Sequence, residues 1–170
     1  MIPTSLNPLG TRGKTFVTSW NVSAGETIYL PLIADGTYNM VVDWGDGSKS
    51  TITSYTQNTH TYSSAGTYTI KINGLCTLWK FKDVTASREK ITSVIQWGDI
   101  GLTSMHGAFY RCYWLLSIAP YAPDVADYWE SFYFCVRLGN IPEKLLYLAS
   151  SLTEIGFAFY YCSSLVTIPS

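Results

Sequence analysis

The sequence predicts a mixed architecture: an antiparallel β-sandwich in the first half and a short solenoid of stacked repeats with small helical turns in the second. Two observations lead to this prediction. Residues 14–74 alternate runs of period-2 hydrophobicity with turn residues. Residues 102–170 repeat one apolar frame, Phe-Tyr-x-Cys-x-x-Leu-x-x-Ile, three times. We expect a sandwich at 14–74, a junction covering the first coil at 75–101, and about three coils at 102–170.

Three runs in the first half have the alternation of half-buried strands. The segment "IYLPL" contains Pro31, which favours an edge strand. Asp46-Gly47, with Gly45 before it, supplies the positive-φ turn of a tight hairpin. The residues expected to share a face are Ile28, Leu30 and Leu32; Met40, Val42 and Trp44; and Tyr68, Ile70 and Ile72.

Asp43, Asp46 and His60 raise the question of a metal site in this half. Two carboxylates on one turn do not supply the six or more oxygens that a hard cation prefers. We therefore expect the aspartates to accept hydrogen bonds from turn amides, and His60 and Tyr62 to hold the start of a strand. The prediction includes no metal and no cofactor.

Two segments of the first half carry a family resemblance. "VDWGDGS" (42–48) and "HTYSSAGTYTIKI" (60–72) resemble the signature of PKD-type domains, which are immunoglobulin-like sandwiches of extracellular proteins. This resemblance implies a spacer or adhesion-accessory module without an active site.

The three copies of the second-half frame align in four columns. Because one coil cannot bury its apolar side alone, we expect the coils to stack and each column to form a continuous rib. The copies lie 23 and 27 residues apart, within the range of leucine-rich repeats. The columns are Phe109, Phe132 and Phe159; Cys112, Cys135 and Cys162; Leu115, Leu138 and Leu165; and Ile118, Ile141 and Ile168.

The repeated frame, with Ala or Ser before its phenylalanine, resembles the leucine-rich repeats of BspA-like bacterial surface proteins over about residues 91–170. The resemblance implies display on a cell surface or virion, and recognition of a protein or glycan without catalysis. No Gly-x-Ser-x-Gly elbow, phosphate loop or His-Glu-x-x-His motif occurs. The shared column predicts buried free thiols, although neighbouring coils would bring them near bonding distance.

Aromatic side chains at the variable positions of the repeats suggest a binding surface. Residues 97–170 hold 16 of the 26 aromatic residues but only nine charged ones. Stacking would align these positions into one exposed patch, and tyrosine, tryptophan and arginine are typical of binding hot spots. Tyr110, Tyr133 and Tyr160 are the same in every copy and are expected to be structural. The candidate ligand-binding residues are Arg111, Tyr113, Trp114, Tyr121, Tyr128, Trp129, Phe134, Arg137 and Tyr161.

The function that we expect is non-enzymatic recognition or adhesion at a surface. The formal net charge of −1 gives no argument for nucleic acid, and no apolar run is long enough for a membrane span. The first residues lack the pattern of a signal peptide, so the expected extracellular or surface location rests on the resemblances. The alternative is a self-assembling fibre, filament or virion decoration protein. The last segment, "SSLVTIPS", carries no polar capping coil, so we expect either that the natural chain continues or that a second copy covers this end in a homo-oligomer.

Overall fold

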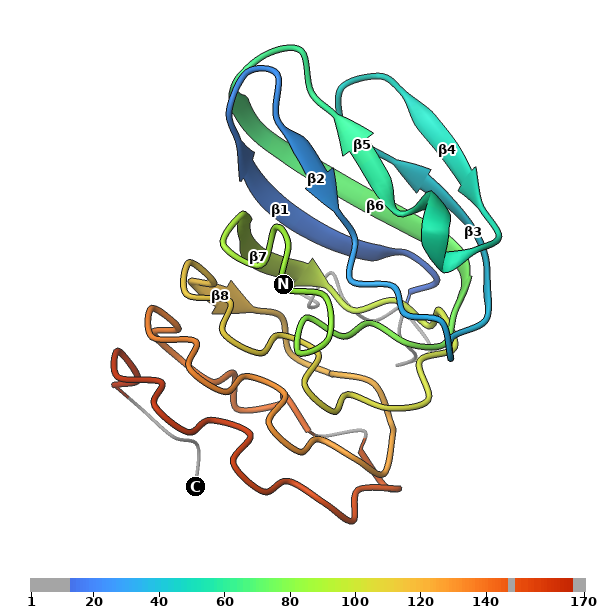
Figure 1. The fold of residues 1–170 in the computed structure, drawn as a ribbon. Coiled ribbons are helices and arrows are strands. Elements are labelled where there is room, and N and C mark those ends of the chain that lie inside the picture. The colour runs from blue at the N-terminus through green and yellow to red at the C-terminus, as the bar shows by residue number, and fades with distance from the viewer. Residues whose placement is uncertain (1–12, 147–148, 167–170) are drawn as a thin grey trace.

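The computed structural model describes residues 13–146 and 149–166, and in these residues the chain is nearly all β. One mixed sheet has six strands in the order β4-β3-β6-β1-β7-β8, and β2 pairs with β5 in a second sheet. In Figure 1, β1 to β6 lie at the top, and the remaining turns of the chain follow one below another toward the C-terminus. The elements are β1 (Phe16–Val22), β2 (Thr27–Tyr29), β3 (Tyr38–Asp43), β4 (Lys49–Ile52), the 3₁₀ turn η1 (Tyr55–Gln57), β5 (Thr59–Thr61), β6 (Gly66–Cys76), β7 (Ile91–Gln96) and β8 (Ser117–Ile118).

The alternation of apolar residues in the first half correctly predicts which side chains are buried. In β3, Met40 and Val42 are buried while Asn39 and Val41 are exposed. Trp44 follows on the same face, and Ile70 and Ile72 of β6 are fully buried. The expected turn is also confirmed, since Gly45 and Gly47 have φ of 82° and 92°. Period-2 alternation therefore identified the core face of the sheet.

The large sheet continues across the limit expected at residue 74. Strand β6 runs through Gly74, which has φ of 108° and pairs with Met40. A Cβ on this glycine would lie 2.4 Å from the Asn39 carbonyl oxygen, so the close approach requires glycine. Strand β1 pairs with β6 on one side and with β7 on the other, and β8 adds in parallel to β7. Residues from both halves of the chain thus belong to one hydrogen-bonded sheet.

The predicted fold class, a sandwich joined to a leucine-rich-repeat solenoid with small helical turns, is wrong. The described residues contain no α-helix, and single turns lie inside the copies, such as the one closed by Cys112 N–H and the Phe109 carbonyl (3.1 Å). Such i-to-i+3 turns produce the three-residue spacing that was attributed to helix. The sheet that crosses residue 74 was missed because its β1–β7 pairing joins segments about 75 residues apart, beyond the reach of local patterns. The domain limits themselves stay a prediction.

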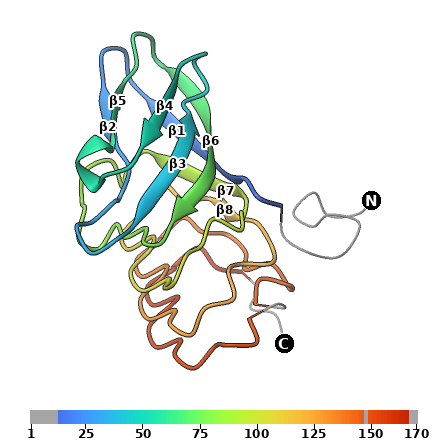
Figure 2. The same ribbon diagram turned by 90° about the vertical axis from the view of Figure 1, so that its right-hand side faces the viewer.

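The three copies of the frame nevertheless lie over one another. Phe109 N–H donates to the Ser131 carbonyl (2.7 Å), and Phe132 N–H donates to the Ala158 carbonyl (2.8 Å). The phenylalanine rings stack with centroids 5.4 and 5.2 Å apart. Figure 2 shows these turns from the side, as loops of similar outline below the sheet. Ile168 lies outside the described residues.

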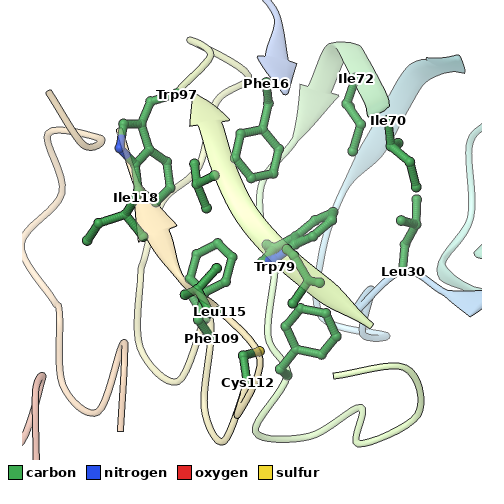
Figure 3. Close-up of a cluster of buried hydrophobic side chains, with 14 of the residues drawn as sticks. Phe16, Leu30, Ile70, Ile72, Trp79, Trp97, Phe109, Cys112, Leu115 and Ile118 are labelled. Atoms are coloured by element: carbon green, nitrogen blue, oxygen red, sulfur yellow. The ribbon is translucent and has the colours of Figure 1, made fainter. Parts of the chain in front are cut away.

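The buried side chains form one continuous core through both halves. Phe16 of β1 contacts Trp79 and Trp97, with ring centroids 5.2 and 5.8 Å apart, and Trp97 contacts Phe109 at 5.9 Å. Figure 3 shows these rings between the sheet residues Ile70 and Ile72 and the repeat residues Cys112, Leu115 and Ile118. The repeats therefore pack on the sheet through a shared aromatic core.

Candidate binding face

A column of tyrosines runs along the surface of the stacked turns. Tyr133 lies between Tyr110 and Tyr160, with ring centroids 4.9 and 5.2 Å apart and nearly parallel planes. Tyr160 is 44% exposed. Partial desolvation and the neighbouring tyrosines raise the pKa of Tyr133, so its hydroxyl stays protonated. We call Tyr110, Tyr133 and Tyr160 the tyrosine column.

A second column has an unusual backbone conformation. Arg111, Phe134 and Tyr161 occupy equivalent positions in the three copies, and all have left-handed φ values of 56° to 58°. Phe134 and Tyr161 stack at 4.5 Å, and Tyr161 is 57% exposed. Residues with a Cβ are strained in this region, by roughly 1–2 kcal/mol each. We call these three residues the left-handed column.

The turn before each repeat phenylalanine has the same conformation. Gly107, Glu130 and Phe157 are equivalent, with φ of 60°, 52° and 54°. Gly107 is required because a Cβ there would lie 2.6 Å from the Lys82 Cβ. Lys82 forms an ion pair with Glu130, and this hydrogen-bonded pairing raises the pKa of the lysine. Phe157 is 52% exposed.

These columns form one surface, which we call the aromatic face. Phe157 makes a T-shaped contact with Tyr160 at 5.5 Å between ring centroids, and Tyr161 makes a similar contact with Tyr160 at 4.7 Å. A hollow of about 190 Å³ lies among Glu130, Tyr133, Phe157 and Tyr160. The aromatic face comprises Tyr110, Arg111, Glu130, Tyr133, Phe134, Phe157, Tyr160 and Tyr161.

Three other candidates from the sequence form a separate cluster. The guanidinium of Arg137 lies 3.8 Å from the ring centroid of Trp114, which is 47% exposed. Arg88 lies over the ring of Tyr113 at 5.8 Å. Trp114 also lines a shallow hollow with Glu89, Lys90 and residues at the end of β1 and the start of β7. Two of the binding candidates, Tyr113 and Trp114, thus lie beside charged groups from neighbouring turns.

Two candidates are not exposed and require a correction. Tyr121 and Tyr128 are 4% and 1% exposed, and the hydroxyl of Tyr128 donates to the Pro123 carbonyl. They were expected at the surface because they lie at variable positions outside the four repeat columns. Here their segment folds inward, and the rings fill the core.

Trp129 has an intermediate position. Its ring covers Gly156, where a Cβ would lie 2.2 Å from a ring carbon, and its edge contacts Phe157 at 5.1 Å. Replacing Trp129 would expose packed surface and would also remove one of the candidate binding residues. Trp129 therefore packs next to the aromatic face and contacts its residue Phe157.

Sequence reasoning missed the tyrosine column and Phe157. The tyrosines were expected to be structural because they are identical in every copy. They stack on one another, with Tyr110 and Tyr133 half-buried and Tyr160 exposed, so they also lie at the surface. A signal for the left-handed turns was present, since Gly107 aligns with Glu130 and Phe157. A glycine in one copy of a repeat indicates a positive φ that the other copies share.

The polar turn of the first half has the structural role that we expected. Asp43 accepts from the Gly45 amide at 3.1 Å, and Asp46 accepts from the Ser48 amide at 2.9 Å. His60 Nε2 lies 2.7 Å from Asp46, and its ring stacks on Trp44 at 4.7 Å. Burial opposes ionisation of Asp46, but hydrogen bonds from Ser48 and His60 lower its pKa to about 2.

The repeat cysteines are buried free thiols that bridge successive copies. Cys135 Sγ donates to the Phe109 carbonyl at 3.2 Å, and Cys162 Sγ donates to the Phe132 carbonyl at 3.1 Å. Burial raises the pKa of Cys135 well above its usual value and that of Cys162 to about 11. Cysteine at this position therefore combines a small apolar volume with a donor that links two turns.

Residues 13–146 and 149–166 contain no group of three side chains suited to hold a metal ion. No helix in these ranges has the length and apolarity needed to cross a bilayer.

Comparison with protein-family models, curated proteins and solved structures found no match to this chain. The resemblances to PKD-type domains and to BspA-like repeats stay predictions.

Proposed function

We propose that the protein is a non-enzymatic recognition module that binds its ligand through the aromatic face. The carrying observation is that Phe134, Phe157 and Tyr161 keep large rings at left-handed backbone positions, where glycine or asparagine would relieve strain. Strained residues that gather on one exposed surface are typical of functional sites. The contacts that these rings make with one another offset part of this strain, and the rings remain at the surface, where a ligand can contact them.

The composition of the face also supports binding. Exposed tyrosine and phenylalanine with a neighbouring arginine are the residue types that dominate interface energies. Their stacking across three turns makes the surface rigid, so little conformational entropy is lost when a ligand binds. The surface or extracellular location is part of this proposal and rests on the family resemblances alone.

The test is a selection with the whole chain as bait. A phage library of random linear peptides and a glycan array are probed with the wild type, with Phe134→Gly/Tyr161→Gly, and with Tyr55→Ala. Tyr55 is an exposed ring of η1, away from the aromatic face, and serves as the control.

We expect ligands selected by the wild type to bind the double variant about tenfold or more weakly, and to bind the control equally. Ligands that bind all three proteins with the same affinity would overturn the proposal, as would the absence of any enriched ligand.

Self-association is a second candidate function. It is favoured by the exposed apolar side chains of the last described turns, where Ile155 and Val166 are 43% and 83% exposed. Size-exclusion chromatography with light scattering tests it: a discrete or open-ended oligomer supports assembly, and a concentration-independent monomer rejects it.

A further inference from the structure

The arginines and lysines of the described residues differ in their ion pairs, although Lys82, like Arg111, lies over the Tyr110 ring, at 5.7 Å. Four lysines form ion pairs with carboxylates of the chain itself. In contrast, each arginine within residues 13–146 and 149–166 lies on an aromatic ring and forms no ion pair with a carboxylate there. The lysine pairs are Lys49–Asp43, Lys80–Asp83, Lys82–Glu130 and Lys90–Glu26, and the arginines are Arg88, Arg111 and Arg137.

Arg111 is the arginine placed within the aromatic face. Its guanidinium lies 5.4 Å from the Tyr110 ring centroid and 5.6 Å from that of Phe134. Its Nε is buried and has no hydrogen-bond acceptor among the described residues. Glu130, the acidic residue of the face, is paired with Lys82. The Arg111 guanidinium therefore lies on the aromatic face without a carboxylate partner among the described residues, and a charged donor of this kind favours an anionic acceptor.

The rings of the face limit the kind of ligand. Tyr133 has a ring on both sides, and Phe134 lies between Tyr161 and the Arg111 guanidinium. Sugars and nucleobases bind aromatic residues mainly by stacking on ring faces, and the faces of Tyr133 and Phe134 are already covered in this way. Ring edges and hydroxyl groups remain, and these suit the mixed apolar and polar contacts of a protein segment.

We infer that the aromatic face binds an acidic segment of a partner protein. An aspartate or glutamate carboxylate accepts hydrogen bonds from the Arg111 guanidinium. An apolar side chain next to it enters the hollow lined by Tyr133 and Tyr160. This inference rests on the proposed function and adds the chemical class of the ligand.

The peptides selected above are the probe. Each is synthesised with its acidic residues intact and with the corresponding amides, and its affinity is measured for the wild type, Arg111→Gln, Arg111→Lys and Arg88→Gln. Arg88 also lies on a tyrosine, outside the aromatic face, and is the matched control. We expect Arg111→Gln and the amide peptides to bind about 10- to 100-fold more weakly, with Arg111→Lys between them and the wild type.

The outcomes separate this inference from the proposed function. Peptides that depend on Phe134 and Tyr161 but not on Arg111 or their own carboxylates leave the proposed function intact and overturn the acidic ligand. Peptides whose affinity depends neither on Phe134 and Tyr161 nor on Arg111 and their own carboxylates overturn the proposed function and the acidic ligand together. Selection of glycans in place of peptides overturns the protein partner. Self-association that is lost in Arg111→Gln assigns the face to a second copy and overturns the separate partner.

Discussion

At the scale of single residues, the left-handed positions of the repeats combine favourable ring contacts with unfavourable backbone strain. Phe134 gains contacts with Tyr161 and Arg111, but it occupies a conformation that costs roughly 1–2 kcal/mol for residues with a Cβ. Phe132, two residues earlier, is fully buried between Phe109 and Phe159. These two phenylalanines therefore have opposite roles although they are near neighbours in the sequence.

We predict that Phe132→Ala lowers the free energy of unfolding by about 3–5 kcal/mol, because it leaves a cavity in the core. Phe134→Gly is expected to change it by no more than about 1 kcal/mol, because relief of strain offsets the lost ring contacts and the entropy of glycine. Urea unfolding of both variants measures the difference. A loss of similar size in the two variants would mean that Phe134 is a core residue.

Asp46 determines part of the acid sensitivity of the first half. Its pKa is about 2 when folded, against an ordinary value of 3.8. A lowered folded pKa stabilises the protein above the ordinary value, and this stabilisation is lost as the pH falls from about 4 to 2. We predict that Asp46→Asn removes this part of the pH dependence, as measured by urea midpoints at several acidic pH values. An unchanged profile would show that the His60 and Ser48 contacts do not form in solution.

At the scale of the elements, the repeats are joined by backbone bonds, stacked rings and thiol donors together. The thiols are the most easily tested of these links. Burial raises the pKa of Cys76 to about 12 and that of Cys162 to about 11, from an ordinary value of 9.0. Neutral buried thiols react slowly, because the thiolate is the nucleophile.

We predict that a thiol reagent labels the native protein far more slowly than the urea-unfolded chain at pH 8. The raised pKa values also predict that stability falls as the pH rises from about 9 toward 12, because the unfolded chain releases these protons first. Mass spectrometry counts the labelled cysteines. Rapid labelling of Cys135 in the native protein would contradict its place between Phe109 and the next turn.

At the scale of the whole molecule, one sheet and one core connect the two halves. Strand β1 depends on β7 for one of its two hydrogen-bonded edges, and Phe16 depends on Trp97 for a ring contact. Neither half of the chain completes these contacts alone. The molecule is therefore expected to unfold as one unit.

We predict that far-ultraviolet circular dichroism and tryptophan fluorescence give coincident urea transitions. A fragment of residues 1–90, which lacks β7, is expected to remain unfolded because Phe16 and Trp20 would be exposed. A stable folded fragment, shown by dispersed amide signals in NMR, would establish two independent domains.

The sequence by itself determined the local structure of this protein. Period 2 places Met40, Val42, Ile70 and Ile72 in the core, because side-chain alternation depends only on the strand backbone. The aligned copies place Phe109 over Phe132 for a similar reason, since equivalent positions meet when identical turns stack.

Only the tertiary structure decided which rings remain outside and how the two halves join. Tyr128 and Tyr133 are both aromatic residues of the same turn, yet one fills the core and the other lies in a surface column. Whether a ring is buried depends on which distant segments of the chain pack over it. The pairing of β1 with β7 likewise joins segments that are far apart in the sequence. Local sequence patterns do not report contacts between distant segments, so the aromatic face could be identified only from the tertiary structure.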